Sequence, residues 1–132
     1  MTVMEYDLPD NLEQTGYCVF PADLEDDALV LFHGTPAKNL DPILENGFRI
    51  PSQDGGTGLS SVSFAKRSSM ALGHACTKRE SEPGDYVIIA VRYESLERKS
   101  LKVNISDIHD YTLDPAPEVI GFCRVPSTYR HA

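Results

Sequence analysis

Two polar side chains stand where predicted strands end or begin, and we expect both to face one opening of the molecule. His33 directly follows the apolar run of residues 28–32, and Gly34 after it lets a ligand approach the backbone closely because glycine has no side chain. Glu118 directly precedes another apolar run. The stretch before it contains prolines, which restrict the backbone and should hold the side chain at the start of the strand. Asp114, four residues earlier, is the alternative carboxylate. An imidazole and a carboxylate at the same opening would form a polar ligand site.

Ser63 and His74 lie on a predicted strand and on the helix that follows it, within reach of the same opening. Ser63 is expected to line the site, because no Ser-His-acid arrangement or nucleophile elbow surrounds it. His74 and Cys76 have a spacing that suits two metal ligands, but no second pair accompanies them, so the sequence predicts no metal site. The alternative for these positions is ordinary structure: His33 as a strand-end histidine, Glu118 as a solvated residue and His74 as a surface imidazole.

The elements that must position these residues are short apolar strands and two main helices, separated by turns. One helix is predicted between Asn39 as its N-cap and Gly47 as the residue that ends it, and a second over residues 66–78. The pattern indicates an α+β domain with a largely strand-built core. The strands are predicted at residues 16–20 (an edge strand), 28–32, 59–65, 86–91, 101–105 and 118–125.

Between the first helix and the strand that carries Ser63, residues 51–61 hold three glycines among polar residues. This composition predicts a mobile loop that crosses the open site. Its glycine spacing is not that of a Walker or Rossmann phosphate motif, so plain flexibility is the simplest reading.

The length of 132 residues, with 41% apolar and 24% charged residues, predicts one globular domain over residues 1–132, in which residues 1–27 form an N-terminal cover segment. No stretch is long and apolar enough to span a membrane, and the acidic N-terminus lacks the form of a signal peptide. The three cysteines are widely spaced and odd in number, which favours neither a disulfide framework nor structural zinc. The simplest expected location is cytoplasmic.

The formal net charge of −8 makes nucleic acid an unfavourable partner, because the field of the whole molecule repels phosphate polymers. It would suit a basic protein partner, and it leaves room for a small anionic ligand held locally. The main basic cluster is expected to be a solvated helix face. It consists of Lys66, Arg67, Lys78 and Arg79.

Four motifs in a fixed order resemble the ADP-ribosyltransferase superfamily, in the branch typified by diphtheria toxin and the poly(ADP-ribose) polymerases. The resemblance covers about residues 29 to 125 and implies an ADP-ribosyltransferase-like split β-sheet core, with NAD as the substrate. The motifs are Phe32-His33-Gly34-Thr35, then Ile43-Leu44-Glu45-Asn46-Gly47-Phe48, then Ser63-Phe64-Ala65 with the helix to His74-Ala75, and finally Glu118 before the last strand.

By this resemblance, His33 would bind a ribose hydroxyl of NAD and the backbone of Gly34 would bind the nicotinamide carboxamide. Glu118 would hold a hydroxyl of the nicotinamide ribose and stabilise the positive charge that develops as the glycosidic bond opens. A carboxylate suits this task because it binds the oxocarbenium-like transition state more strongly than the ground state. The remaining residues expected to bind NAD are Thr35, Ser63, Phe64 and His74.

The sequence departs from the family pattern at one stacking position. The polymerase-like members have Tyr-Phe-Ala where this chain has Ser63-Phe64-Ala65, so one aromatic ring is missing. His74 falls where those members carry a second tyrosine and is expected to supply the remaining stack. The string from Ser60 to Ser63 is also similar to the Ser-Thr-Ser strand of arginine-type toxins, which use an arginine where this chain has His33.

The resemblance implies a compact mono-ADP-ribosyltransferase of bacterial, phage or toxin type, which releases nicotinamide from NAD and passes ADP-ribose to an acceptor, expected to be a protein. Water as the acceptor would make it an NAD glycohydrolase. The alternative is a catalytically inactive module of the same fold that binds NAD or a partner. An RNA phosphotransferase of related fold is disfavoured by the acidic charge and by the lack of additional basic residues.

Overall fold

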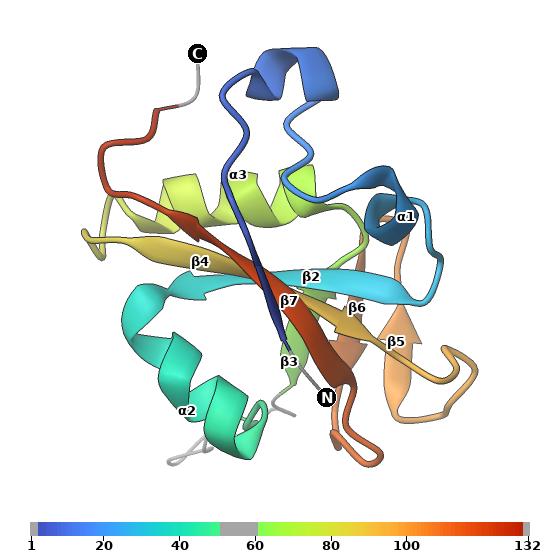
Figure 1. Ribbon diagram of the computed structural model, residues 1–132. Helices are drawn as coiled ribbons and strands as arrows, with labels where there is room; N and C mark the ends of the chain where they lie inside the picture. Colours follow the sequence, from blue (N-terminus) through green and yellow to red (C-terminus); the bar gives the residue numbers. More distant parts are fainter. Residues whose placement is uncertain (1–2, 51–60, 131–132) are drawn as a thin grey trace.

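The structure, a computed structural model, describes residues 3–50 and 61–130, and within these ranges seven strands form one mixed sheet (Figure 1). The strand order is β1-β7-β4-β2-β3-β6-β5. The strands are β1 (Met4–Tyr6), β2 (Val30–Pro36), β3 (Val62–Ala65), β4 (Tyr86–Arg92), β5 (Leu101–Val103), β6 (Asp107–Asp110) and β7 (Glu118–Val125). The helices are α1 (Ala22–Glu25), α2 (Leu40–Asn46) and α3 (Ser68–Lys78), with 3₁₀ turns at Leu12–Thr15 and Ala37–Asn39. The predicted α+β class with two main helices is confirmed.

The centre of the sheet is the antiparallel pair β2 and β4, whose residues are almost all buried. Their register runs without interruption from Val30 opposite Arg92 to Pro36 opposite Tyr86. The continuous apolar sequence of β4 fits a strand that is covered on both faces. Because the pairing continues to Pro36, β2 is longer than predicted, and His33 lies within the strand instead of at its end.

The two main helices cover opposite sides of the central strands (Figure 1). On one side, Ala71, Leu72 and Ala75 of α3 pack against β2 and β4. On the other side, Leu40 of α2 is buried in a second cluster. The first cluster receives Phe32, Ile88 and Ala90 from the sheet, and the second receives Leu31, Ile89, Val91 and Phe122.

The sheet is split between β2 and β3. These strands are paired only at Phe32 and Ala65, whereas β3 and β6 are paired at four positions. Beyond the single pair the two strands separate, and the side chain of His33 enters the gap. The predicted strand over residues 59–65 is therefore confirmed from Val62 onward, while residues 51–60 of the glycine-rich segment lie outside the described residues.

The structure explains why glycine is needed at two positions, Gly34 and Gly47. A Cβ on Gly34 would lie 2.7 Å from the carbonyl oxygen of Ala71, so only glycine permits this close approach of α3 to β2. Gly47 ends α2 with φ of 79°, as predicted. Asn39 precedes that helix as predicted, but its side chain does not cap it and instead donates a hydrogen bond to Thr35 Oγ1 at 2.9 Å.

The N-terminal segment packs on the sheet and α3, although the predicted edge strand over residues 16–20 does not form. The edge strand is β1, which pairs in parallel with β7. Further along, Phe20 is buried and stacks on Phe32 with ring centroids 5.4 Å apart. Ser68 at the start of α3 accepts a hydrogen bond from the Val19 amide at 3.0 Å and donates one to Glu25. These contacts join residues before β2 to the helix after β3.

Candidate active site

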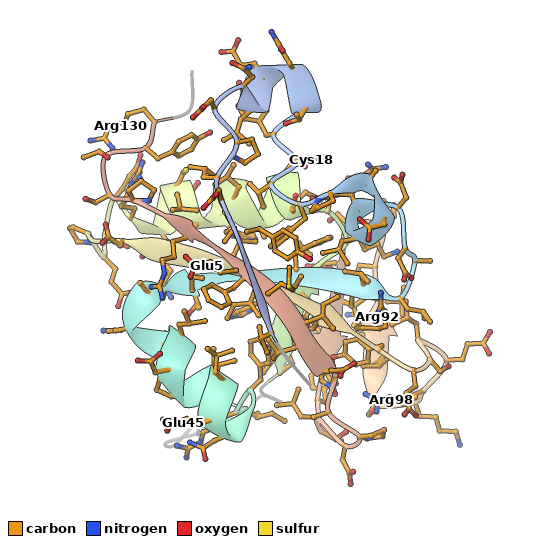
Figure 2. The ribbon with its side chains drawn as sticks, viewed as in Figure 1. Glu5, Cys18, Glu45, Arg92, Arg98 and Arg130 are labelled. Atoms are coloured by element: carbon orange, nitrogen blue, oxygen red, sulfur yellow. The ribbon has the colours of Figure 1, made fainter. Side chains whose placement is uncertain are left out.

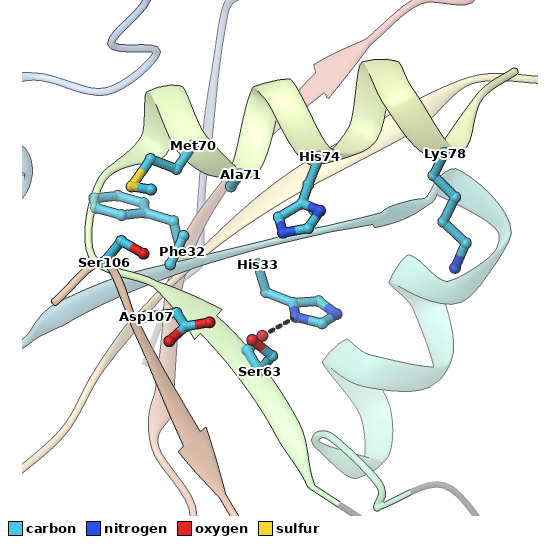
Figure 3. A pocket seen from close by; sticks show the side chains of 11 residues that line it. Phe32, His33, Ser63, Met70, Ala71, His74, Lys78, Ser106 and Asp107 are labelled. Carbon is cyan, nitrogen blue, oxygen red and sulfur yellow. Dashed lines mark hydrogen bonds between the residues drawn. The ribbon is translucent and has the colours of Figure 1, made fainter. Parts of the chain in front are cut away.

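A cavity of about 270 Å³ lies between α3 and the split in the sheet (Figure 3). Helix α3 forms its roof, β2 and β3 form its floor, and the start of β6 closes one end. The cavity exists because β2 and β3 separate beyond Phe32 and Ala65, while α3 continues above both strands. The lining residues with polar side chains are His33, Ser63, His74, Lys78, Ser106 and Asp107.

His33 lies in the gap between β2 and β3 with a fixed orientation. Its Nδ1 atom is 2.8 Å from the carbonyl oxygen of Ser63. Phe48 and Phe64 hold the ring from the α2 side, with centroids 5.1 and 5.6 Å from it. Because a carbonyl oxygen only accepts hydrogen bonds, Nδ1 must carry the proton, which leaves Nε2 as an acceptor when the ring is neutral. The geometry therefore prepares His33 to bind a hydroxyl group.

The surroundings of His33 favour its neutral form. Burial lowers its pKa below the ordinary value of 6.5, and the positive charges of Lys78 and His74 lower it further. The hydrogen bond to the Ser63 carbonyl opposes this shift by favouring the protonated ring. The net direction is downward, so the imidazole stays neutral at pH 7 and keeps Nε2 as an acceptor.

The carboxylate that lines this cavity is Asp107, the first residue of β6. Its position follows from the register, in which Asp107 lies opposite Ala65 and thus on the same face as Ser63. Asn104 donates a hydrogen bond to Oδ1 at 2.8 Å, and His109 Nε2 lies 3.4 Å from Oδ2. Both carboxylate oxygens are therefore held by neighbours while the group remains partly exposed to the cavity.

His109 connects Asp107 to a second polar residue. Its other nitrogen, Nδ1, lies 3.0 Å from Ser61 Oγ. With both nitrogens engaged, the His109 ring is fixed beside Asp107, and the ring of Tyr111 stacks on it with a centroid distance of 6.5 Å. A row of polar side chains in contact therefore lies along the edge of the cleft, in the order Ser61, His109 and Asp107.

The last residue of β6, Asp110, is completely buried and fixes the strand through its hydrogen bonds. Its Oδ2 accepts hydrogen bonds from Tyr93 Oη at 2.8 Å and Arg98 Nη2 at 3.0 Å, and its Oδ1 accepts two backbone N–H groups. Burial raises the pKa of Tyr93 far above its ordinary value, and the bond to Asp110 raises it further, so the phenol stays protonated as the donor. This network fixes the strand that carries Asp107.

A second cavity of about 440 Å³ meets the first at His33 and Ser63, which line both. It lies on the α2 side of the split. Its walls combine apolar surface from Ile43 and Phe48 with the polar groups of Thr35. The two cavities form one cleft with two lobes, and His33 stands at their junction.

The residues predicted to bind the ligand are divided between these lobes. His33, Gly34, Ser63 and His74 gather in the lobe under α3, and Thr35 lines the lobe beside α2. Phe64 was predicted to contact the ligand, but its side chain is completely buried beneath the His33 ring. Because the side chain of Phe64 faces the core, it supports His33 and does not line the cleft.

The structure does not bring Glu118 to the cleft. Glu118 lies opposite Arg92 of β4 (labelled in Figure 2), and Arg92 lies opposite Val30 of β2. His33 is three residues beyond Val30, and because successive strand residues alternate between faces, Glu118 and His33 lie on opposite faces of the sheet. The expectation that they face one opening is not met. Asp114, the alternative, is exposed in the connection after β6 and lines neither lobe.

The charged residues Asp107 and Lys78 line the lobe under α3 but were not predicted as site residues. Strand β6 was missed because only Ile108 among its four residues is apolar, so residues 106–117 read as a polar connection. The available signal was the alternation of Asp107 and His109 around Ile108, which is typical of a strand with one polar face. Lys78 was predicted to belong to a solvated helix face.

The mixed seven-stranded sheet with its few helices is consistent with an ADP-ribosyltransferase-like fold. A family model described as the poly(ADP-ribose) polymerase catalytic domain matches residues 6–95. The chain therefore belongs to the poly(ADP-ribose) polymerase catalytic domain family, within the ADP-ribosyltransferase superfamily, whose domains use NAD as their substrate. Comparisons with curated proteins and with solved structures found no significant match.

The family match includes the residues from β2, β3 and α3 that line the cleft and ends before β6. Asp107 lies outside the matched residues, and its place in the cleft comes from the structure alone. Among residues 3–50 and 61–130, no helix is long and apolar enough to cross a membrane. In the same part of the chain, no three His, Cys, Asp or Glu side chains gather in a way that could hold a metal ion.

Proposed function

We propose that this protein is a compact mono-ADP-ribosyltransferase of toxin or effector type, with Asp107 in the place first expected for Glu118. The observation that carries the proposal is that Asp107 and His33 line the same cavity from different strands. The reaction breaks the bond between nicotinamide and ribose, releases neutral nicotinamide and joins the ribose carbon to an acceptor, which gives up a proton. We place this reaction in the cytoplasm, where the three unpaired cysteines would remain reduced.

The two lobes of the cleft suit the two halves of NAD. The nicotinamide ribose would enter the lobe under α3, where His74 offers a ring for stacking and the Gly34 backbone lies in the floor. The adenosine half would enter the larger lobe beside α2, which combines apolar walls with Thr35. His33 at the junction would accept a hydrogen bond from a ribose hydroxyl through Nε2.

Asp107 would act on the nicotinamide ribose. As the glycosidic bond opens, positive charge develops on the sugar, and a fixed carboxylate stabilises that charge more strongly in the transition state than in the ground state. Asn104 and His109 hold the carboxylate in place, so little reorganisation is needed during the reaction. Removal of one such electrostatic group typically lowers kcat by about 10²–10³-fold.

An acceptor would approach from a neighbouring cavity of about 700 Å³ that shares Met70 and Ser106 with the lobe under α3. This outer cavity opens between the segment before β2 and the turn before β6. Ile105 on that turn is 98% exposed, and Asp26 and Arg67 supply charges of both signs. A protein surface suits these walls because it can supply apolar and charged groups together. Water in place of the protein would give NAD hydrolysis.

A second candidate function is supported by Ser63, which leaves no aromatic ring on β3 opposite His74. With only one stacking ring, the nicotinamide would be held less firmly than in the tyrosine-bearing members of the family. The protein would then be an NAD-binding or partner-binding module that has lost turnover. This alternative predicts NAD binding without nicotinamide release.

The deciding experiment measures nicotinamide release from NAD by the purified protein, alone and with a cell lysate as a source of acceptors. Asp107→Asn keeps the size of the side chain and removes its charge, and Glu118→Gln makes the same change outside the cleft. We expect release that rises with lysate, falls by about 10²–10³-fold in Asp107→Asn and is unchanged in Glu118→Gln.

The other outcomes assign different functions. Release without any transfer to lysate proteins would identify an NAD glycohydrolase. NAD binding with no release under either condition would support the binding module. Equal release by wild type and Asp107→Asn, with loss in Glu118→Gln, would contradict the assignment of the carboxylate.

A further inference from the structure

Lys78 lies on the face of α3 that looks into the cleft, one turn after His74 (Figure 3). Residues four apart on a helix share a face, so both side chains reach the same cavity. In Figure 3 the Lys78 side chain extends on the side of the cavity away from Asp107. The helix therefore presents an ammonium group on the side of His33 that faces away from Asp107.

The charges along the cavity are ordered. Asp107 supplies a carboxylate at one end, and Lys78 supplies a cation at the other, close enough to His33 for its charge to lower the pKa of that imidazole. Between them lie the Ser63 hydroxyl and the His74 imidazole. The lobe under α3 thus has an acidic end and a basic end, although the whole chain carries a formal net charge of −8.

NAD has a matching distribution of charge, with a cationic nicotinamide ring at one end and an anionic diphosphate on the other side of the nicotinamide ribose. We propose that Lys78 binds the diphosphate of NAD and thereby sets the direction in which the dinucleotide lies in the cleft. This inference rests on the proposed function, because it assigns a residue to the same ligand. A bound diphosphate at the junction of the lobes would lie beside His33 and leave the nicotinamide ribose facing Asp107.

Glu82 is the competing partner of Lys78. Its carboxylate lies 3.6 Å from Lys78 Nζ and 3.5 Å from Lys38 Nζ, so it pairs with both lysines. Such exposed pairs contribute little to stability, and a ligand phosphate can replace one of them at small cost. Only Lys78 of the two lysines lines the cavity, while the Lys38 side chain is 73% exposed. Lys38 is therefore a matched control with the same ion-pair partner.

The competing explanation is that Lys78 only forms an ordinary ion pair with Glu82 one helical turn away. In that case Lys78→Met and Lys38→Met would have the same small effects on stability and no effect on ligand binding. The two explanations are separated by ligands that differ in the diphosphate. ADP-ribose carries the diphosphate without nicotinamide, and adenosine carries neither.

The experiment is calorimetric titration of wild type, Lys78→Met and Lys38→Met with ADP-ribose and with adenosine, at two salt concentrations. We expect Lys78→Met to weaken ADP-ribose binding by about tenfold or more, since a charge-assisted hydrogen bond is lost, and to reduce the salt dependence. Adenosine binding should not change, and Lys38→Met should behave as wild type. Glu82→Gln, which removes the competing carboxylate, should strengthen ADP-ribose binding.

Equal ADP-ribose affinities for wild type and Lys78→Met would overturn the assignment of Lys78 and leave the proposed function intact. Equal losses in Lys78→Met and Lys38→Met would also overturn it, because the effect would then be one of general surface charge. If wild type binds neither ADP-ribose nor NAD, both the inference and the proposed function fail. Thermal unfolding of each variant shows whether a loss of affinity comes from unfolding.

Discussion

At the scale of single residues, the neutral state of His33 links ligand binding to pH. The hydrogen bond from Nδ1 to Ser63 and the lowered pKa together keep Nε2 available as an acceptor. Protonation would convert Nε2 into a donor and place a cation next to Lys78. A hydroxyl could then no longer donate a hydrogen bond to the ring. Protonation of His33, which burial disfavours, would therefore also weaken ligand binding.

The same residue makes stability depend on pH in a definite direction. The pKa of His33 in the folded state lies below its ordinary value of 6.5, so the unfolded chain binds more protons as the pH falls. The contribution of His33 is therefore complete above pH 6.5 and declines as the pH falls through 6.5 toward the folded-state pKa. Urea unfolding at several pH values between 7.5 and 5.5 should show that wild type loses more stability on acidification than His33→Gln. Parallel curves for the two proteins would contradict this linkage.

At the scale of elements, the cleft depends on how closely α3 approaches β2. Gly34 allows this approach, because any Cβ there would meet the Ala71 carbonyl at 2.7 Å. The backbone carbonyl cannot move aside as a flexible side chain can, so the helix itself would have to shift. The sequence suggested that Gly34 admits a ligand, and the packing of the helix is a second and independent reason for glycine.

Gly34→Ala should therefore destabilise the fold by about 1–3 kcal/mol, as overpacking of a tight contact does. Gly73→Ala is the matched control, because Gly73 lies on α3 and a Cβ added there would meet no atom within 4 Å. Replacing a glycine within a helix by alanine should leave stability unchanged or raise it by up to about 1 kcal/mol. Denaturant unfolding of both variants measures the difference. Similar effects at the two positions would show that the helix does not press on β2.

At the scale of the whole molecule, the N-terminal segment is joined to the core through Phe20. Its ring stacks on Phe32 and meets Tyr6 edge to face, with both centroid distances at 5.4 Å. Phe20→Ala should cost about 3–5 kcal/mol of unfolding free energy, because it leaves a cavity between the segment and the sheet. Met4→Ala, on the 53% exposed side chain of Met4 in the same segment, should change stability by no more than about 0.5 kcal/mol. A small effect of Phe20→Ala would mean that the segment folds apart from the sheet.

Much of the β2 side of the site could be predicted from the sequence, because its signals are local. The run of apolar residues before His33 predicts a strand, and Gly47 marks the end of α2 by its conformation. Asp107 was harder to find, because the local signal of its strand is only the short alternation around Ile108. The strand is fixed by the burial of Asp110, which depends on Arg98 and Tyr93, 12 and 17 residues away in the chain.

Glu118 shows the limit of reasoning from the order of motifs alone. A carboxylate before the last strand satisfies the expected sequence order, but the order of strands in the sheet places β7 beside β4, away from β3 and β6. Strand order depends on contacts between distant parts of the chain, and the chain order of two strands does not determine whether they are neighbours. Only the register of β4 with β2 and with β7 shows that Glu118 and His33 lie on opposite faces of the sheet.

The single pair between β2 and β3 has a consequence for how this protein can diverge from its relatives. His33, Gly34 and Thr35 lie on β2, whose register is fixed by seven paired positions with β4. Ser63 and Asp107 lie across the gap on β3 and β6. Substitutions on β3 and β6 leave the β2–β4 register undisturbed, so one wall of the cleft can change its shape while the other keeps it.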